Sequence, residues 1–327
     1  MIYINPDPHE SLNQAFQRLQ IKNEKVIFVQ SKLAKLHSNF FLIKLILMFI
    51  SSVIQVFDTL LSIIKFQKTI VVREFNNYVL ILFSPIFFFF RKNILFNINH
   101  NLIGNKFNSL FLIKIMCSMG FRFLLLDGSI VVSRLPKVIR TQLLTPYFPL
   151  TCQIYKTRKI SVKKKRILAI IGNARIKRID IIRFRKIISN LAQIQNWHIH
   201  ISNSFKIKDY FANYKNIKFF NTSSRKKYLK FISSSDATLI IANKKDYLCR
   251  NSGSIMDSIS CGVVPIVPHL PVFISQISKP AKIGLAYKSL KNINEILLKF
   301  NSLIDVLIKN RKHYFFERQI ININQVN

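Results

Sequence analysis

The stretch from residue 216 to residue 273 decides the fold: NIKFFNTSSRKKYLKFISSSDATLIIANKKDYLCRNSGSIMDSISCGVVPIVPHLPVF. Short apolar runs alternate in it with segments of helical periodicity, and turn residues separate them. The pattern predicts strands at 217–220, 237–242 and 263–267, and helices over 224–234 and 252–261. Strands that are apolar throughout suit burial on both faces, so we expect a parallel sheet with helices on both sides.

The same alternation continues toward both ends of the chain. In the second half it adds strands at 167–172, 197–201 and 284–287, and helices over 178–193, 270–277 and 290–316. In the first half it predicts strands at 2–4, 26–30, 68–73, 93–98, 122–126 and 129–133, and helices over 10–20, 41–65, 78–90, 108–118 and 135–144. We therefore expect an α/β chain with two Rossmann-like βαβ domains that face each other across a cleft.

A break in the pattern separates the two halves. Residues 145–166, TPYFPLTCQIYKTRKISVKKKR, begin with prolines and end in a basic run, which is typical of a connector. The expected organisation is an N-terminal Rossmann-like domain over 1–150, a connector over 151–165 and a C-terminal domain over 166–327. The ligand is expected in the cleft, at the carboxyl ends of the strands.

Charge and cysteine usage bound the classes of partner. Lysine and arginine together number 50 against 14 acidic residues, a formal net charge of +36. Such a charge attracts polyanions, but the sequence holds no paired Cys/His finger, aromatic RNA-binding signature or basic heptad helix, so we expect no nucleic-acid partner.

The cysteines are far apart in the sequence, at Cys117, Cys152, Cys249 and Cys261. Their spacing indicates neither a zinc site nor a disulfide framework, and it suits free thiols in the cytoplasm.

Residues 40–66, FFLIKLILMFISSVIQVFDTLLSIIKF, are long enough to cross a bilayer. Polar and charged residues interrupt this segment, at Lys44, Ser51, Ser52, Gln55 and Asp58. An ionised Asp inside a bilayer costs about 2.5–3.5 kcal/mol, so we favour a buried or membrane-surface helix over a span. The first residues, MIYINPDPHESLNQAF, lack the apolar core of a signal peptide. The expectation is a cytoplasmic protein, peripheral on an anionic inner membrane face.

The segment NSGSIMDSISCG, residues 251–262, holds the candidate site. A helix N-terminus offers unpaired N–H groups and the positive end of the dipole, so a start at Ser252, Gly253 and Ser254 suits a phosphate. Gly253 allows a ligand to approach the backbone closely, and Arg250 just before the helix adds a cation. Asp257, one turn further on, is placed to accept hydrogen bonds from sugar or ribose hydroxyls. The same residues also fit a helix with an ordinary N-cap and a solvated acid.

The order of these features resembles the donor-binding half of the group 1 glycosyltransferases, which have the two-domain GT-B fold. The matching residues are Ser235-Asp236 before a strand, Ser252-Gly253-Ser254 at a helix start, Asp257, Cys261-Gly262 and Val264-Pro265-Ile266-Val267. DSISCGVVPIV is similar to the family's EAMACGVPVV. The resemblance implies that the helix start holds the donor diphosphate and that Asp257 binds the ribose or the donor sugar.

The sequence departs from the family pattern at the first of its two glutamates. The family separates them by seven residues; here Asp257 takes the second position and Cys249 the first. One extra residue also lies between Gly262 and Pro265 relative to the common pattern. These departures leave open which sugar the donor carries.

Two further segments resemble the family. ILAIIGNARIKR, residues 167–178, is similar to the strand that opens the donor domain, and Arg175 and Lys177 match the basic pair that reaches the diphosphate. An ordinary basic loop is the alternative there, while a P-loop is excluded because the sequence has no Gly-x-x-x-x-Gly-Lys-Ser/Thr. NILFNINHNL, residues 93–102, puts His100 after a predicted strand, as in the family near acceptor and sugar. A histidine there can bind the transferring sugar or handle a proton, although a lone histidine is commonly structural.

The resemblance implies a metal-independent, retaining glycosyltransferase of the hexosyltransferase type. It would move a sugar from a nucleotide diphosphate sugar to a glycan, lipid-linked or small acceptor, bound on the N-terminal domain. No cofactor is expected besides this co-substrate, because the helix start and the basic pair can stabilise the leaving diphosphate. A final helix is expected to return toward the first domain.

Two alternatives stay open. A sugar-nucleotide epimerase of the same fold requires more acid and base residues than the expected cleft offers. A non-catalytic GT-B-like protein that binds a membrane surface or a polyanion is favoured by the missing first glutamate and by the low glycine count, 7.

Overall fold

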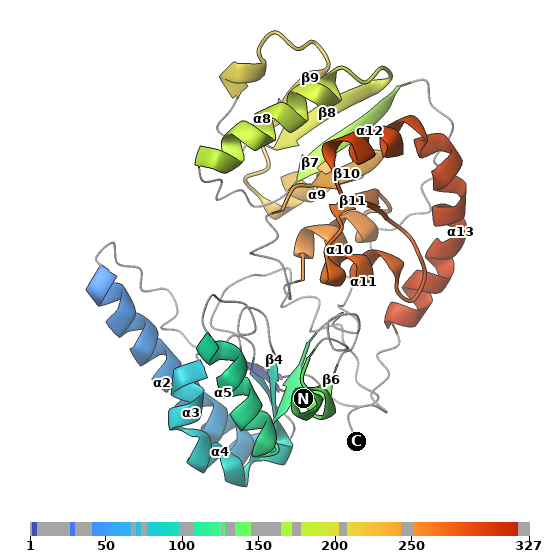
Figure 1. Cartoon of the computed structure of the whole chain (residues 1–327). Coiled ribbons are helices and arrows are strands. Elements are labelled where there is room, and N and C mark those ends of the chain that lie inside the picture. Colours follow the sequence, from blue (N-terminus) through green and yellow to red (C-terminus); the bar gives the residue numbers. More distant parts are fainter. Residues whose placement is uncertain are drawn as a thin grey trace. The chain divides into compact units, whose positions relative to one another are not determined.

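The structure is a computed structural model (Figure 1). It describes residues 2–4, 27–29, 41–66, 70–72, 77–97, 107–125, 127, 135–144, 165–171, 178–202, 208–242 and 251–319. The chain divides into two compact units: described residues up to 144 belong to the first, and residues 165–242 and 252–319 to the second. Each unit is built on a parallel sheet, which confirms the predicted α/β class. The expectation of a cleft between them concerns their placement and stays a prediction.

The first unit has a sheet of six described strands in the order β2-β1-β3-β4-β5-β6. They are β1 (Ile2–Ile4), β2 (Ile27–Val29), β3 (Ile70–Val72), β4 (Ile94–Asn97), β5 (Arg122–Leu124) and β6 (Leu143–Leu144). All pairs are parallel, and Ile2 lies opposite both Ile27 and Ile70. Because β1 pairs on one side with β2 and on the other with β3, the direction of winding reverses at β1.

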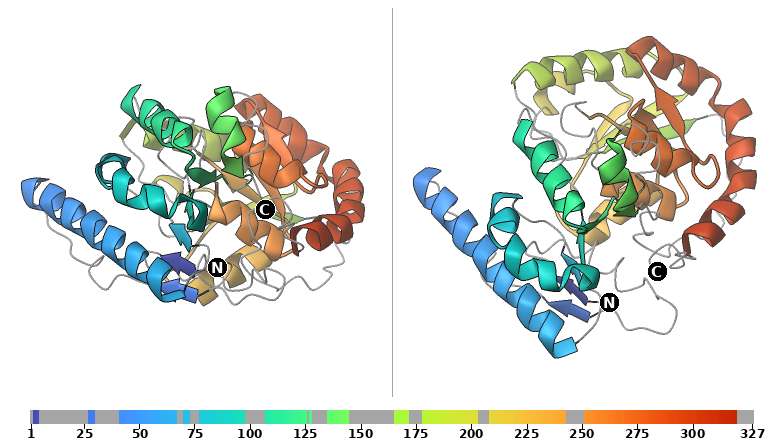
Figure 2. Two further views of the ribbon diagram at one scale, coloured as in Figure 1. Left: turned by 90° about the horizontal axis from the view of Figure 1, so that it is seen from below. Right: turned by 60° about the horizontal axis from the view of Figure 1, so that its bottom comes forward.

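The described helices of the first unit stand in a row beside the sheet (Figure 1). They are α2 (Phe41–Phe66), α3 (Asn77–Leu82), α4 (Ser84–Phe89), the 3₁₀ turn η2 (Arg91–Asn93), α5 (Phe107–Ser118) and α7 (Lys137–Thr141). Helix α2 packs beside α3, α3 beside α5, and α5 beside α7. The first turns of α2 extend beyond the neighbouring helices of the unit (Figure 2).

Two predicted helices of this unit differ in the structure. The helix predicted over 78–90 is interrupted at Phe83, because Pro85 has no N–H to donate to the carbonyl of Ile81. The Ser84 hydroxyl donates to that carbonyl instead, at 2.7 Å. The helix predicted over 135–144 ends at Thr141, and Leu143–Leu144 pair with β5 as a strand. The helix predicted over 10–20 and the strand predicted over 129–133 lie outside the described residues.

The second unit has a sheet of six described strands in the order β12-β11-β10-β7-β8-β9. They are β7 (Arg166–Ile171), β8 (Trp197–Ser202), β9 (Ile217–Phe220), β10 (Ala237–Ile240), β11 (Val264–Pro268) and β12 (Leu285–Tyr287). All pairs are parallel. Counted from β7, this is the order of a doubly wound dinucleotide-binding sheet, with the winding reversed between β7 and β10.

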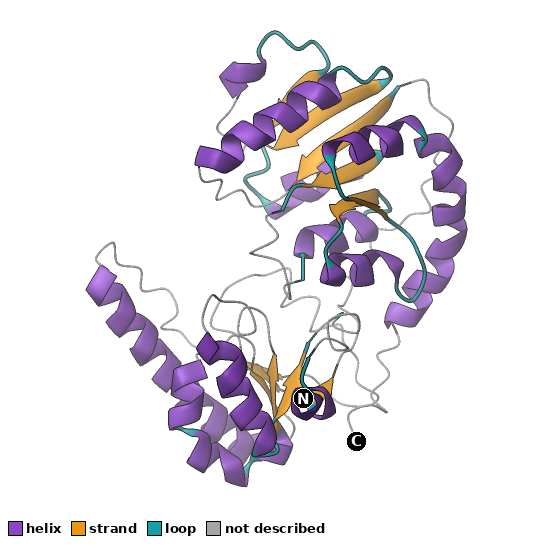
Figure 3. Ribbon diagram, viewed as in Figure 1, coloured by secondary structure: helices purple, strands orange, loops and turns teal. Residues whose placement is uncertain are grey.

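Helices cover both faces of the second sheet (Figure 3). They are α8 (Arg178–Ala192), the 3₁₀ turn η3 (Lys208–Phe211), α9 (Arg225–Ser233), α10 (Gly253–Ser260), α11 (Pro271–Ser278), α12 (Leu290–Leu298) and α13 (Phe300–Gln319). Helices α8 and α12 lie on one face, and α9, α10 and α11 on the other. The single helix predicted over 290–316 is two helices in the structure, α12 and α13, which meet at Lys299.

The core under α8 and α12 follows the alternation of the strands. Leu168 and Ile170 of β7 point to this face and pack among Phe184, Ile188 and Leu191 of α8. All five are at most 1% exposed. Burying an aliphatic or Phe side chain of this size contributes about 1.5–3 kcal/mol each, so this face fixes the register of β7.

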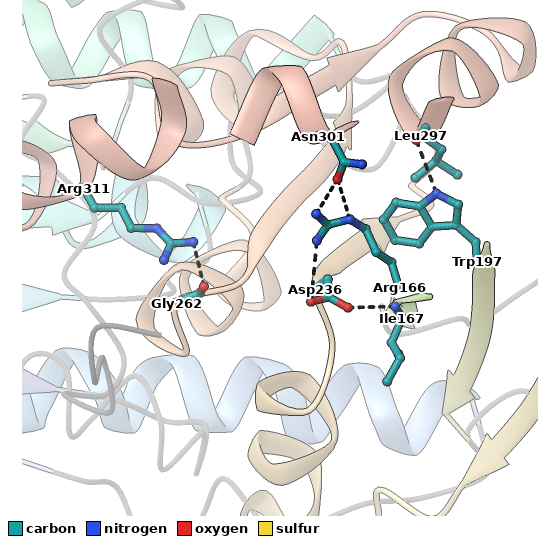
Figure 4. A network of polar contacts seen from close by, with 8 residues as sticks. All are labelled: Arg166, Ile167, Trp197, Asp236, Gly262, Leu297, Asn301 and Arg311. Atoms are coloured by element: carbon teal, nitrogen blue, oxygen red, sulfur yellow. Dashed lines mark hydrogen bonds and ion pairs between the residues drawn. The ribbon is translucent and has the colours of Figure 1, made fainter. Parts of the chain in front are cut away.

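Asp236 ties the amino ends of two strands to the C-terminal helix (Figure 4). One carboxylate oxygen accepts the N–H of Ile167 at 2.9 Å, and the other lies 3.9 Å from the guanidinium of Arg166. Arg166 in turn donates from Nε to the side-chain oxygen of Asn301 on α13, at 2.8 Å. Asp236 and Arg166 are almost fully buried, so the acid that precedes β10 has a structural role.

Donors along α13 satisfy carbonyls at the ends of other helices. Arg311 donates to the carbonyl of Gly262, just after α10, at 2.7 Å. Arg318 donates to the carbonyls of Gln276 and Lys279, at the end of α11, at 3.2 and 2.8 Å. Such carbonyls have no partner within their own helix and carry the negative end of its dipole. Cations on α13 therefore hold this helix against the second unit; the predicted return of the chain to the first domain stays a prediction.

Candidate functional site

The candidate site lies at the carboxyl edge of the second sheet, where α10 begins. Helix α10 follows β10 and precedes the parallel strand β11, so its N-terminus is at the edge where these strands end. Strand β10 pairs with β7, the strand at which the winding reverses. Open parallel sheets bind ligands at this position.

Ser252 is the N-cap residue of α10, and its backbone is clamped by Gln276 of α11. The N–H of Ser252 donates to Gln276 Oε1 at 3.1 Å, and Gln276 Nε2 donates to the carbonyl of Ser252 at 3.3 Å. Both residues are buried. The Ser252 side chain makes no capping hydrogen bond to the helix, so the clamp, and not the hydroxyl, fixes where α10 starts.

Gly253 is the first residue of α10, and the described part of the chain does not require a glycine there. A Cβ atom built on Gly253 meets no heavy atom of the described residues within 4 Å, and the φ of Gly253 is not positive. Gly284, by contrast, has chain atoms at 2.9 Å from the same position. The open space at Gly253 lies at the positive end of the helix dipole, which is the place where an anionic ligand binds best.

Asp257 forms a two-point ion pair with Arg225 of α9. Arg225 Nη1 and Nη2 donate to the two carboxylate oxygens at 2.7 and 2.6 Å. The Asp257 side chain is 7% exposed and that of Arg225 is 32% exposed. The acid is therefore positioned by a cation and is not a freely solvated helix residue.

Tyr228 joins the same pair of helices one turn further along α9. Its phenol lies near Ser254 and Asp257 of α10, and both influence its pKa. Burial, followed by the Asp257 carboxylate, raises the pKa of Tyr228, so the phenol stays protonated. Arg225 and Tyr228 are three residues apart and so share one face of α9, as Ser254 and Asp257 do on α10. The two helices thus bring polar residues together beside the ion pair.

The local sequence explains why Arg225 is available at this place. Ser224 caps α9 and accepts the N–H of Lys227 at 3.3 Å, so Arg225 becomes the first residue of the helix. Strand β9 ends at Phe220, so α9 begins close to the carboxyl edge of the sheet. The helix predicted over 224–234 is thus confirmed, with Ser224 as its cap.

The structure brings four of the predicted site residues together on one helix start: Ser252, Gly253, Ser254 and Asp257. The other predicted residues, His100, Arg175, Lys177 and Arg250, lie outside the described residues, and their roles stay predictions. Within the described part of the chain, no group of three or more His, Cys, Asp or Glu residues is arranged to hold a metal ion.

Sequence reasoning missed three residues of the site: Arg225, Tyr228 and Gln276. For Arg225 and Tyr228 a signal existed, because an Arg and a Tyr three residues apart directly after a serine cap share one helix face. For Gln276 the sequence offered none, since only the packing of α11 beside α10 brings it to Ser252.

The fold of the chain is similar to that of several solved proteins, although its sequence matches no known family. No protein-family model matches the sequence, and no curated protein matches it. The structure of sucrose-phosphate synthase from Thermosynechococcus elongatus is similar, with a TM-score of 0.62 at 12% identity, over 99% of this chain and 95% of that one. The Anabaena protein HepE, solved with UDP and glucose, gives a TM-score of 0.57 at 10% identity, over 100% and 96%.

The chain has the GT-B fold. A third solved structure, the glycotransferase of kitacinnamycin, agrees, with a TM-score of 0.53 at 8% identity, over 98% of this chain and 94% of that one. These similarities confirm the predicted pair of Rossmann-like domains. In the order of the GT-B fold, the described helix start at Gly253 belongs to the second of these domains.

Proposed function

We propose that this GT-B chain is a glycosyltransferase that uses a nucleotide diphosphate sugar as donor. The observation that carries the proposal is the open space at Gly253, at the dipole end of α10 and at the carboxyl edge of a doubly wound sheet. The similar protein HepE was solved in complex with UDP-glucose, which supports a donor of this class.

In this proposal the start of α10 receives the diphosphate. The N–H groups of the first turn and the Ser254 hydroxyl face the phosphates, while Arg175, Lys177 and Arg250 supply the balancing charge. Ser252 sets the position of the turn through its backbone. Asp257, oriented by Arg225, accepts a hydrogen bond from the ribose or the sugar.

The remaining features of the reaction are part of the same proposal. The transfer needs no metal ion, because the helix start and the basic residues stabilise the leaving diphosphate. It retains the configuration of the sugar, uses His100 near the transferring sugar, and takes a glycan, a lipid-linked or a small acceptor on the first unit. The chain works in the cytoplasm.

A panel of sugar nucleotides tests the proposal on the full chain. Uridine, guanosine, adenosine and thymidine diphosphate sugars are added singly, and the unfolding temperature is measured; the true donor raises it because it binds the folded state. Release of nucleoside diphosphate from the stabilising donor is then followed with and without EDTA. We expect stabilisation by one nucleotide class and slow, EDTA-insensitive release.

The outcomes of this panel separate the candidates. Stabilisation without release, at any acceptor tried, favours the non-catalytic GT-B-like alternative. Conversion of the sugar nucleotide into its epimer favours the epimerase. No stabilisation by any sugar nucleotide contradicts the proposal.

A further inference from the structure

Helix α2 presents an apolar face to solvent. Ile50, Phe57, Leu61 and Ile64 are 45%, 54%, 64% and 65% exposed. Their spacings of seven, four and three residues place them on one side of the helix. The opposite side, which packs on the unit, is more polar: it buries Gln55, Thr59 and Ser62 beside Val56 and Ile63.

This arrangement is the reverse of that of an ordinary surface helix, which turns its apolar stripe inward. The buried polar side chains are accommodated locally; the Thr59 hydroxyl, for example, donates to the carbonyl of Gln55 at 2.6 Å. The exposed apolar residues gain nothing from the fold as described. A contiguous apolar face of this kind marks a surface that another body covers.

The α2 face touches the neighbouring helices at one aromatic pair. Phe57 contacts Phe83, which lies between α3 and α4, with ring centroids 6.5 Å apart. Leu82 of α3 and Phe89 of α4 are exposed as well, by 63% and 83%. We call Ile50, Phe57, Leu61 and Ile64 the docking surface.

The charges of this unit identify the chemistry of the partner. Its described charged side chains at or near the surface are seven basic ones and one acid: Lys65, Arg91, Lys92, Lys114, Arg122, Lys137, Arg140 and Asp58. Lys65 borders the docking surface, because it follows Ile64 on α2. Asp58, next to Phe57, is half-buried, and the other described acid of this unit, Asp127, is buried.

We propose that the docking surface rests on the headgroup region of an anionic phospholipid bilayer. Apolar side chains would enter the boundary between headgroups and acyl chains, while the surrounding Lys and Arg side chains pair with lipid phosphates. A second copy of the chain fits less well, because its equally basic surface would be brought against this one. The docking does not depend on the proposed transferase activity, so the two can fail separately.

Co-sedimentation of the full chain with vesicles tests this inference. Vesicles contain either phosphatidylcholine alone or phosphatidylcholine with about 30% phosphatidylglycerol. The second composition gives the vesicle surface a negative potential of about 30 mV or more in magnitude. We expect binding to the anionic vesicles at low salt, and weaker binding as added salt screens the electrostatic part. The double variant Leu61→Gln with Ile64→Gln should bind at least about tenfold more weakly.

A matched control comes from the second unit. Leu298 and Val306 are 73% and 58% exposed there, so Leu298→Gln with Val306→Gln removes comparable apolar surface from another place. This control should bind vesicles like the wild type. Circular dichroism should show both double variants folded, because all four side chains are exposed.

Three results would overturn the inference. The first is absence of binding to anionic vesicles at low salt. The second is equal binding of the α2 variant and the wild type. The third is a wild-type dimer in solution that the α2 variant, but not the control, turns into a monomer, because the docking surface would then belong to a second copy.

Discussion

At the scale of single residues, the ion pair between Arg225 and Asp257 carries the most testable chemistry. Arg225→Met leaves a nearly buried carboxylate without its two charged hydrogen bonds. Breaking a buried pair costs about 3–5 kcal/mol, and because Arg225 is about a third exposed we expect a smaller loss, roughly 2–3 kcal/mol. Urea unfolding measures this loss, with Lys226→Met, on the exposed neighbour, as the control. The double variant Arg225→Met with Asp257→Leu should recover most of it; no recovery would contradict the assignment.

His200 gives a residue-scale prediction on pH. Its ring stacks on Phe220 with centroids 4.5 Å apart, and its Nδ1 has no hydrogen-bond partner among the described residues. Burial, followed by the nearby Lys218 and His198, lowers the pKa of His200 from 6.5 to about 4. The unfolded chain therefore binds this proton more readily, and stability present above pH 6.5 is lost as the pH falls toward 4.

The expected loss through His200 is roughly 3 kcal/mol between pH 7 and pH 4, from the size of the pKa change. The free energy of unfolding, measured across this range, should fall less steeply in His200→Phe than in the wild type. His313, exposed on α13, provides the control variant His313→Gln. Equal slopes for wild type and His200→Phe would show that other groups cause the acid sensitivity.

At the scale of elements, a substitution at the start of α10 should weaken binding of the proposed donor without lowering the stability of the fold. Gly253→Val fills the open space in front of the helix without meeting chain atoms, so the fold should be retained. The diphosphate loses its close approach, and binding of the donor should fall by roughly one to two orders of magnitude. Calorimetry with the stabilising sugar nucleotide measures the change, and Ala212→Val, at an exposed position on the same unit, is the control. Unchanged affinity in a folded Gly253→Val protein would place the donor elsewhere.

In helix α13, by contrast, a substitution should lower the stability of the fold without affecting the proposed reaction. Arg318→Lys keeps the charge but not the planar fork that reaches the carbonyls of Gln276 and Lys279. Since Arg318 is 2% exposed, the carbonyl of Lys279 is then poorly satisfied, whereas that of Gln276 keeps the hydroxyl of Tyr314, and we expect a loss of about 1–3 kcal/mol. Thermal unfolding should show this, whereas Lys312→Arg, an exchange on the exposed side of α13, should change little. A stable Arg318→Lys protein would mean that the helix is held mainly by its apolar contacts.

At the scale of the whole molecule, the net charge of +36 opposes compactness in every part of the chain. Salt screens this repulsion, so the unfolding temperature should rise between about 50 and 500 mM sodium chloride, as the Debye length falls below roughly 10 Å. Differential scanning fluorimetry checks this. Sodium sulfate at matched ionic strength tells general screening from binding of a particular anion, and a temperature independent of salt would count against the repulsion.

The elements that sequence could predict are those whose signal is local. The strands and helices of residues 165–319 follow the predicted ranges closely, because buried apolar runs and turn residues both lie in the sequence. The interruption of the helix at Phe83 was not predicted, although Pro85 is a local signal for it. The phenylalanines that follow make the whole segment read as one apolar helix. The short strand β6 was missed because Leu143–Leu144 become a strand only by pairing with β5.

The candidate site divides in the same way. The position of its helix start was predictable from Ser252, Gly253 and Ser254, although the clamp by Gln276, and not a serine cap, fixes it. Arg225, the partner of Asp257, and Gln276, the partner of Ser252, come from α9 and α11, and no sequence pattern states which of these polar residues will meet. Asp236 was predicted only as part of a family motif, and the structure shows that its carboxylate accepts the N–H of Ile167.

The pairing of Arg225 with Asp257 also has a consequence for the history of this gene. Each side chain makes the loss of the other costly, so substitutions at these two positions should have been fixed together, not singly. Descendants of a common ancestor should then show either both residues or neither. A lineage that restored the longer glutamate at position 257 would need room for one more methylene against α9, and a change at position 225 should accompany it.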